Sequence, residues 1–107
     1  MKRLVITAGL VLLAGIAEAQ ATSGPGCLIV AHVAANDALN MRAGPGTSHA
    51  VVDVLPPGNH GIIHLDGPCV PKSVAPRSRW CKVSHYNGDQ VTKGWIKRRY
   101  TTDSDCP

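Results

Sequence analysis

Aromatic and acidic residues are scarce in this chain. It has no phenylalanine, only two tryptophans and two tyrosines in 107 residues, and a single glutamate, Glu18. A core without phenylalanine is small, and small cores often need covalent support. With so few carboxylates, and with no serine in a recognisable nucleophile motif, the sequence gives no sign of acid, base or nucleophilic catalysis. We therefore expect no catalytic residues.

Helical periodicity is also absent. No window of about 11 residues after the N-terminal segment repeats apolar positions at the helical spacing. Instead, short apolar or alternating segments lie between turn residues, which predicts an all-β domain. The Pro68–Ser78 loop, which contains Pro71 and Pro76, is expected to be neither helix nor sheet. The expected strands are 28–30 with Val33, 39–42, 50–55, 61–65, 79–86 and a last strand that begins at Gly94.

Long hydrophobic runs are missing except for Leu4–Ile16. Basic residues precede this run, and Ala17-Glu18-Ala19 follows it in the small-x-small pattern of a signal cleavage site. The run is shorter than the roughly 20 apolar residues that cross a bilayer. We predict a cleaved signal peptide over residues 1–19, with cleavage after Ala21 as the alternative. The protein is then periplasmic or secreted and has no stable membrane anchor.

The remaining residues, 20–107, have the length of one small domain. Residues 20–26 are small, polar and turn-rich, which predicts a flexible leader before a domain over 27–107. The mature chain keeps nine of the 11 Lys and Arg residues and six of the seven Asp and Glu residues, a formal net charge of +3. So low a charge on an exported domain argues against a nucleic-acid partner.

All four cysteines follow the predicted signal peptide, and an even number in a small exported domain predicts two disulfides. Three pairings are open. We favour Cys69 with Cys81, which closes the proline-rich loop, and Cys27 with Cys106, which joins the chain ends. A metal site is the alternative, but the cysteines are too scattered for the close ligand pairs of zinc sites. We expect no metal and no other cofactor.

A short strand and a turn follow one another in the run from residue 39 to residue 47. Leu39 and Met41 alternate with Asn40 and Arg42, so the first two face the core and the other two face outward. Residues 44–46 are Gly-Pro-Gly, in which the glycines permit backbone angles closed to other residues and the proline fixes its own φ. The run predicts a strand that ends in a rigid turn.

Four segments in a fixed order carry the most specific pattern in the chain. They are Leu39-Asn40-Met41-Arg42-Ala43-Gly44-Pro45-Gly46-Thr47-Ser48, then Val51-Val52 with Leu55 and Gly58, Trp80-Cys81-Lys82-Val83, and Gly94-Trp95-Ile96 with Tyr100. Together they resemble the bacterial SH3 family over roughly residues 30–100. The resemblance implies a five-stranded SH3-like barrel, with residues 44–46 in its RT loop, that binds a ligand rather than catalyses a reaction.

The chain departs from the family pattern at three places. The Pro68–Ser78 loop is longer than usual, and residues 89–93 lengthen the last hairpin beyond its Asn87-Gly88 turn. His49 stands where the family often has an aromatic residue, frequently tyrosine. The third departure leaves fewer aromatic side chains for a ligand groove.

The side chains expected to contact a ligand are mostly aromatic or cationic. Aromatic rings with a polar edge are favoured at recognition surfaces, and Arg42 offers a forked donor to a carboxylate. In the alternative reading, the tryptophans only fill the core, and Arg42 pairs with Asp37 or Asp53 to hold its loop. The candidates are Arg42, His49, Trp80, Tyr86, Trp95 and Tyr100.

Lys97-Arg98-Arg99, with Lys93 nearby, is the densest basic cluster. It suits weak contact with an anionic surface such as phospholipid headgroups or lipopolysaccharide, and otherwise forms a solvated face. If these residues continue a strand, Lys97 and Arg99 share a face and Arg98 lies opposite them.

The sequence as a whole predicts an exported, non-enzymatic SH3-like module. Its expected partner is peptidoglycan, a cell-wall peptide or a periplasmic protein. Two alternatives stay open: a structural or interaction subunit of an exported complex, and a secreted inhibitor or effector. The second alternative is suggested by the small size, the two disulfides and the proline-rich loop.

Overall fold

The computed structural model describes residues 26–107, so the expected signal peptide and most of the expected leader lie outside it. The described part is all-β, with two disulfides, and confirms that prediction. Its elements are β1 (Cys27–Val30), β2 (Leu39–Arg42), β3 (Val51–Leu55), β4 (Ile62–Leu65), the 3₁₀ helix η2 (Pro76–Ser78), β5 (Trp80–Asn87), β6 (Gln90–Lys97), the 3₁₀ helix η3 (Arg98–Tyr100) and β7 (Thr101–Ser104).

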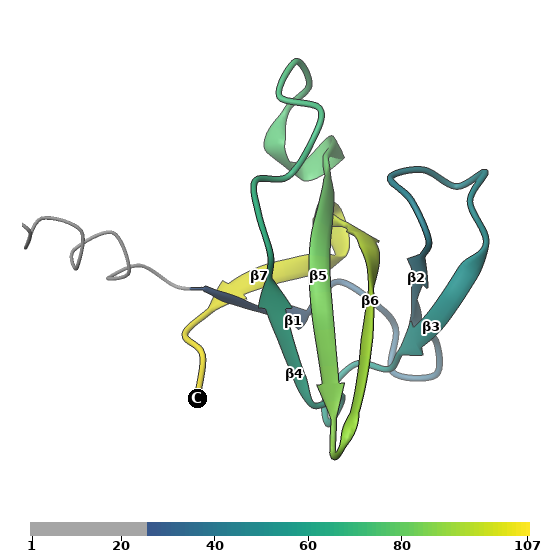
Figure 1. Ribbon diagram of the computed structural model, residues 1–107, viewed down its shortest axis with the longest axis vertical. Helices are drawn as coiled ribbons and strands as arrows, with labels where there is room; N and C mark the ends of the chain where they lie inside the picture. Colours follow the sequence, from purple (N-terminus) through teal and green to yellow (C-terminus); the bar gives the residue numbers. More distant parts are fainter. Residues whose placement is uncertain (1–25) are drawn as a thin grey trace, which may run out of the picture.

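The seven strands form one antiparallel sheet in the order β3-β2-β6-β5-β4-β1-β7. The longest pairing joins β5 to β6, from Trp80 opposite Lys97 to Asn87 opposite Gln90. In Figure 1 these two strands stand side by side, and β7 runs across their direction. The sheet has an SH3-like architecture, and the β5–β6 hairpin supports the wall of the site described below.

The described residues form seven strands, whereas the family resemblance implies five and the residue pattern predicts six segments. The main strand missing from the prediction is β7. Its sequence, Thr-Thr-Asp-Ser, is polar and has no alternating apolar residues that would indicate a strand. Its strand conformation follows from backbone pairing with β1 along its whole length, from Val30 opposite Thr101 to Cys27 opposite Ser104. The last hairpin is also longer than predicted, because β6 begins at Gln90 rather than Gly94.

The core lies where the inward faces of six strands meet. Leu39 and Met41 of β2 are buried and Asn40 is exposed, as the alternation of that run predicts. Buried apolar side chains come from every strand except β7, and they form one contiguous cluster. Its members are Leu28, Val30, Leu39, Met41, Leu55, Ile63, Cys81, Val83 and Ile96.

The Gly-Pro-Gly turn follows β2, but the reason predicted for its glycines is wrong. Neither Gly44 nor Gly46 has a positive φ. The His49 ring packs against Gly44, and a Cβ there would lie 2.5 Å from His49 Nδ1, so a larger residue would displace that ring. A second close approach occurs at Gly94, where a Cβ would lie 2.7 Å from the Arg42 carbonyl oxygen. This glycine lets β6 reach β2.

The disulfides join Cys27 to Cys106 and Cys69 to Cys81, which are the two favoured pairs. The loop closed by Cys69 and Cys81 is more regular than expected. It contains η2, which begins at Pro76, and an isolated bridge between Val70 and Trp80. The expectation of no helix failed because proline is compatible with the first turn of a helix, where its missing N–H has no partner to lose.

Candidate functional site

A groove of about 500 Å³ lies between the connection from β1 to β2 and the end of β6. Residues 32–38, β2, the first residue of β5 and residues 97–100 all contribute to its lining. The groove brings together three of the six candidate ligand contacts, Arg42, Trp80 and Tyr100. We call it the Trp80 groove.

Trp80 forms an aromatic wall of this groove. It pairs across the sheet with Lys97, and directly opposite residues share a face. The Lys97 Nζ lies 5.2 Å from the centre of the indole ring, which is a cation–π contact. Trp80 is only 9% exposed, and its backbone forms two hydrogen bonds with Val70. The groove therefore has a fixed aromatic wall with a cation against its face.

Tyr100 provides a second, more exposed ring at the same groove, with 37% of its surface accessible. Its carbonyl oxygen accepts a hydrogen bond of 2.9 Å from the Ala31 N–H, which ties η3 to the segment after β1. The chain leaves β6 after Lys97 and turns into η3, so the predicted continuation of the strand is wrong. Lys97 and Arg99 nevertheless line the same groove, while Arg98 forms an ion pair with Asp103 at 2.7 Å.

Arg42 lines the groove and also holds the loop that follows β2. Its Nη1 donates hydrogen bonds to the carbonyl oxygens of Thr47, at 3.1 Å, and His49, at 3.0 Å. The expected partners are otherwise engaged, because Asp53 pairs with His85 and Asp37 accepts from the Ala38 N–H. Arg42 therefore stabilises the loop, as the alternative reading holds, but through backbone carbonyls instead of a carboxylate.

The charges around the groove are mostly positive. Arg42, Lys97 and Arg99 line it, and Asp37 is the one carboxylate among its lining residues. Guanidinium and ammonium groups are strong donors to carboxylates, and their hydrogen bonds gain strength beside a dry aromatic surface. The combination suits a ligand that has both an apolar part and a free carboxylate.

The other three candidates lie outside the groove. Tyr86 and Trp95 alternate with buried residues along β5 and β6, so both are on the outer face of that hairpin. Tyr86 is opposite Val91, and Trp95 is opposite Lys82. His49 is exposed, and its ring packs against Gly44. Trp95 is also opposite Arg42 of β2, on the strand face that carries Trp80 and Lys97, although it does not line the groove. The groove therefore contains only three of the six predicted ligand contacts.

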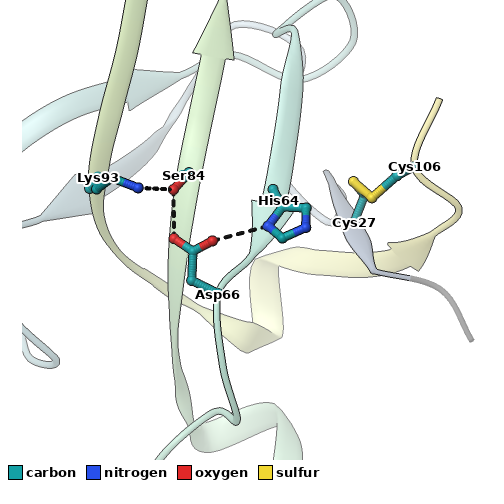
Figure 2. Close-up of polar contacts among 6 residues, drawn as sticks. All are labelled: Cys27, His64, Asp66, Ser84, Lys93 and Cys106. Atoms are coloured by element: carbon teal, nitrogen blue, oxygen red, sulfur yellow. Dashed lines mark hydrogen bonds and ion pairs between the residues drawn. A yellow bond between two sulfur atoms is a disulfide. The ribbon is translucent and has the colours of Figure 1, made fainter. Parts of the chain in front are cut away.

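Lys93 does not join the basic cluster that the sequence suggested. It lies on the same strand face as Lys97 but four residues away, about 13 Å along the strand. Figure 2 shows its Nζ directed to Ser84 Oγ, at 2.9 Å, and Ser84 in turn donates to Asp66 Oδ2, at 2.6 Å. The second oxygen of Asp66 lies 3.0 Å from His64 Nδ1.

This network lowers the pKa of Asp66 from its ordinary value of 3.8. Partial burial acts in the opposite direction, since it disfavours the charged carboxylate. The hydrogen bonds from Ser84 and His64, together with the charges of Lys93 and His64, outweigh that desolvation. Asp66, which directly follows β4, therefore stays ionised to a lower pH than an ordinary aspartate.

His32 is the lining residue that sequence reasoning missed most clearly. It has a φ of 61°, and it is the one residue other than glycine with a positive φ in the part that the structure describes. Such backbone angles are uncommon for a residue with a side chain. No sequence motif predicts a histidine with a positive φ. The one available signal was that His32 is a polar residue just after the first strand.

Two kinds of feature are absent from residues 26–107. This part of the chain contains no group of three or more His, Cys, Asp or Glu side chains that could hold a metal ion. It also contains no helix long and apolar enough to cross a membrane.

A family model described as bacterial SH3 domain matches residues 37–102 of the chain. The match includes β2 to η3 and the first residues of β7, and with them most of the Trp80 groove. Comparison with curated proteins and with solved structures gave no match.

Proposed function

The chain belongs to the bacterial SH3 domain family, and from this we propose that it is a non-enzymatic module that binds the peptide part of the cell wall. The ligand is a carboxylate-bearing peptide of peptidoglycan. It lies in the Trp80 groove and contacts both aromatic rings and the cations beside them.

One observation carries this proposal: the groove places Trp80 and Tyr100 beside Arg42, Lys97 and Arg99. Wall peptides combine small apolar side chains with free carboxylates, so they offer a partner for each type of side chain. Interfaces are enriched in tryptophan, tyrosine and arginine because these residues combine large contact area with directed hydrogen bonds. Both Trp80 and Arg42 are held by backbone hydrogen bonds, so little order has to be gained on binding.

The place of action proposed here is outside the cytoplasm. Two disulfides are present, and disulfides persist in oxidising compartments such as the periplasm. The predicted signal peptide over residues 1–19 supports the same location. Peptidoglycan is accessible there.

The test compares two tyrosines that are almost equally exposed. Tyr100 lines the groove and is 37% exposed, whereas Tyr86 lies on the outer face of β5 and is 40% exposed. Retention on purified sacculi is measured for the wild type, Tyr100→Ala and Tyr86→Ala. We expect Tyr100→Ala to weaken retention by at least about tenfold, the size typical of an interface anchor, and Tyr86→Ala to retain the wild-type affinity.

A cation pair extends the same test. Lys97→Gln removes a charge from the groove, and Lys82→Gln removes one from the same face of the β5–β6 hairpin but outside the groove. Lys97→Gln should weaken retention, and free stem peptide should compete with sacculi for the wild type. Absence of wild-type retention, or equal losses in both members of a pair, would refute the groove as a wall-binding site. Thermal unfolding of each variant checks that the fold is intact.

A further inference from the structure

A second pocket, of about 540 Å³, lies on the other side of Arg99 and Tyr100 from the Trp80 groove. It is formed where η2 of the proline-rich loop meets η3 and the start of β7. Its cationic or potentially cationic side chains are Arg77, Arg98, Arg99 and His32. No Asp or Glu is among the residues that line it. We call it the Arg77 pocket.

The loop that carries Arg77 is fastened at several points. The Cys69–Cys81 disulfide closes its base, and Val70 and Trp80 exchange backbone hydrogen bonds just inside. Arg79 crosses the loop, with Nε donating to the Val74 carbonyl at 2.9 Å and Nη2 to the Lys72 carbonyl at 3.1 Å. These contacts set the position of η2 before any ligand arrives, which lowers the entropic cost of binding.

The opposite wall of the pocket is joined to this loop. The Arg98 N–H donates to the Arg79 carbonyl oxygen at 2.9 Å, so η3 is connected to the end of the loop. The Arg98 side chain is oriented by its ion pair with Asp103. Both walls are therefore fixed relative to one another by hydrogen bonds, and the arginines they carry face a common space.

Two of the arginines have free guanidinium groups. Within residues 26–107, neither Arg77 nor Arg99 forms a side-chain hydrogen bond, and both are exposed. A guanidinium group offers a planar fork of donors that matches the oxygens of a phosphate group. Arg98 is already paired with Asp103, but the two forks of Arg77 and Arg99 have no carboxylate partner, and two such forks at one pocket favour a multiply charged oxyanion over a single carboxylate.

His32 is a second and independent sign of a binding site here. Its left-handed backbone, with φ of 61°, is costly for a residue with a side chain, and such strain is concentrated at functional sites. The exposed His32 lines both the Arg77 pocket and the Trp80 groove. It therefore lies at the boundary between them.

We propose that the Arg77 pocket binds a discrete phosphate group of a phosphorylated ligand. Arg77 and Arg99 donate to the phosphate oxygens, and Arg98 and His32 contribute positive charge or donors from the sides. The pocket is concave, and Tyr100 is the only exposed large apolar residue that lines it. A surface for bilayer insertion needs a broader apolar face, so a phosphate ester in solution fits better than a membrane.

The experiment titrates the full chain with inorganic phosphate and follows its NMR signals at constant ionic strength. Arg77→Gln is compared with Lys82→Gln, which removes the same charge from an exposed residue that lines neither pocket. We expect saturable shifts around Arg77, Arg99 and His32. Arg77→Gln should raise the Kd for phosphate at least about tenfold, the loss of a charge-assisted contact, while Lys82→Gln changes it less than about twofold.

Two further arms separate this proposal from its rivals. A soluble phosphate ester should compete with inorganic phosphate, and vesicles with and without phosphatidylglycerol show whether a membrane is preferred. Binding to the vesicles alone, absence of saturable phosphate shifts, or equal losses in Arg77→Gln and Lys82→Gln would overturn the proposal. Because Arg77 does not line the Trp80 groove, Arg77→Gln should retain wild-type binding to sacculi, so the two proposals fail independently.

Discussion

Arg42 holds the loop after β2 through backbone groups alone. The strand alternation predicts that Arg42 faces away from the core, and it is half-buried on that side. Its hydrogen-bond partners are the backbone carbonyls of Thr47 and His49, groups that every residue has. No sequence motif identifies such partners, because they depend on how the loop turns and not on which side chains it carries.

Two buried histidines, His60 and His85, are also held by contacts that no sequence motif identifies. His85 is 4% exposed, with Nδ1 2.7 Å from Asp53 Oδ2 and Nε2 against the His60 carbonyl oxygen. His60 is also buried, and its Nε2 accepts from the Val30 N–H at 3.2 Å. These contacts join β1, β3 and β5, and no local sequence pattern predicts them.

Asp66 gives a testable consequence at this scale. Its folded-state pKa is lower than the unfolded value of 3.8, so it stabilises the fold above that pH and ceases to do so as pH falls through the folded pKa. We expect Asp66→Asn to lower the free energy of unfolding by about 1 kcal/mol at pH 6. Below the folded pKa the difference from the wild type should disappear. Urea unfolding at a series of pH values measures it.

Asp89→Asn is the matched control for Asp66→Asn, since Asp89 is an exposed carboxylate in the turn between β5 and β6. This variant should be nearly neutral at pH 6, because Asp89 forms no side-chain hydrogen bond or ion pair within residues 26–107. If Asp66→Asn were equally neutral at pH 6, or if its cost did not diminish in acid, the contribution assigned to the Ser84 and His64 contacts would be wrong.

Among the elements, the strands with apolar or alternating residues were predicted, and the polar or charged segments were not. The segment 39–42 was predicted with its exact bounds, because buried and exposed side chains alternate along it. β7 was missed, because its polar side chains carry no pattern and its conformation depends on β1. η3 was missed for a related reason: charged residues 97–99 are compatible with either a strand or a turn, and tertiary contacts select between them.

The proline-rich loop is the element whose order depends most on one bond. The Cys69–Cys81 bridge closes a segment with a sequence separation of 12, for which the chain-entropy model gives about 3 kcal/mol. We expect Cys69→Ala with Cys81→Ala to lower the free energy of unfolding by at least that amount, since Cys81 is also buried in the core. The loop should become sensitive to proteases between residues 70 and 79.

Arg79→Gln is the companion variant, because it removes the two side-chain hydrogen bonds across the loop and leaves the disulfide in place. Its loop should be cleaved faster than the wild type but more slowly than that of the double alanine variant. A loop that resists proteases equally in all three proteins would show that neither the bridge nor Arg79 orders it.

For the whole molecule, the sequence predicted which types of side chain form the site better than it predicted which of these side chains lie together. Arg42, Trp80 and Tyr100 were chosen for their chemistry, and the sheet brings them to one groove although they are far apart along the chain. Tyr86 and Trp95 were chosen for the same reason, but neither lines the groove, although Trp95 is opposite Arg42. Which aromatic residues meet is determined by sheet register and by the turn into η3, and both depend on pairing between distant strands.

The Cys27–Cys106 disulfide acts on the molecule as a whole, since it joins the start of β1 to the residues after β7 across a sequence separation of 79. The chain-entropy model gives about 4 to 5 kcal/mol for a loop of this length, more than for the shorter bridge. Small domains have a total stability of about 5 to 15 kcal/mol, so this bond is a large part of it. We expect Cys27→Ala with Cys106→Ala to lower the urea midpoint strongly and to increase amide exchange in β1 and β7 first. Cys106 is exposed, so little packing is lost with it, and a midpoint within error of the wild type would show that backbone pairing of β1 with β7 alone holds the chain ends together.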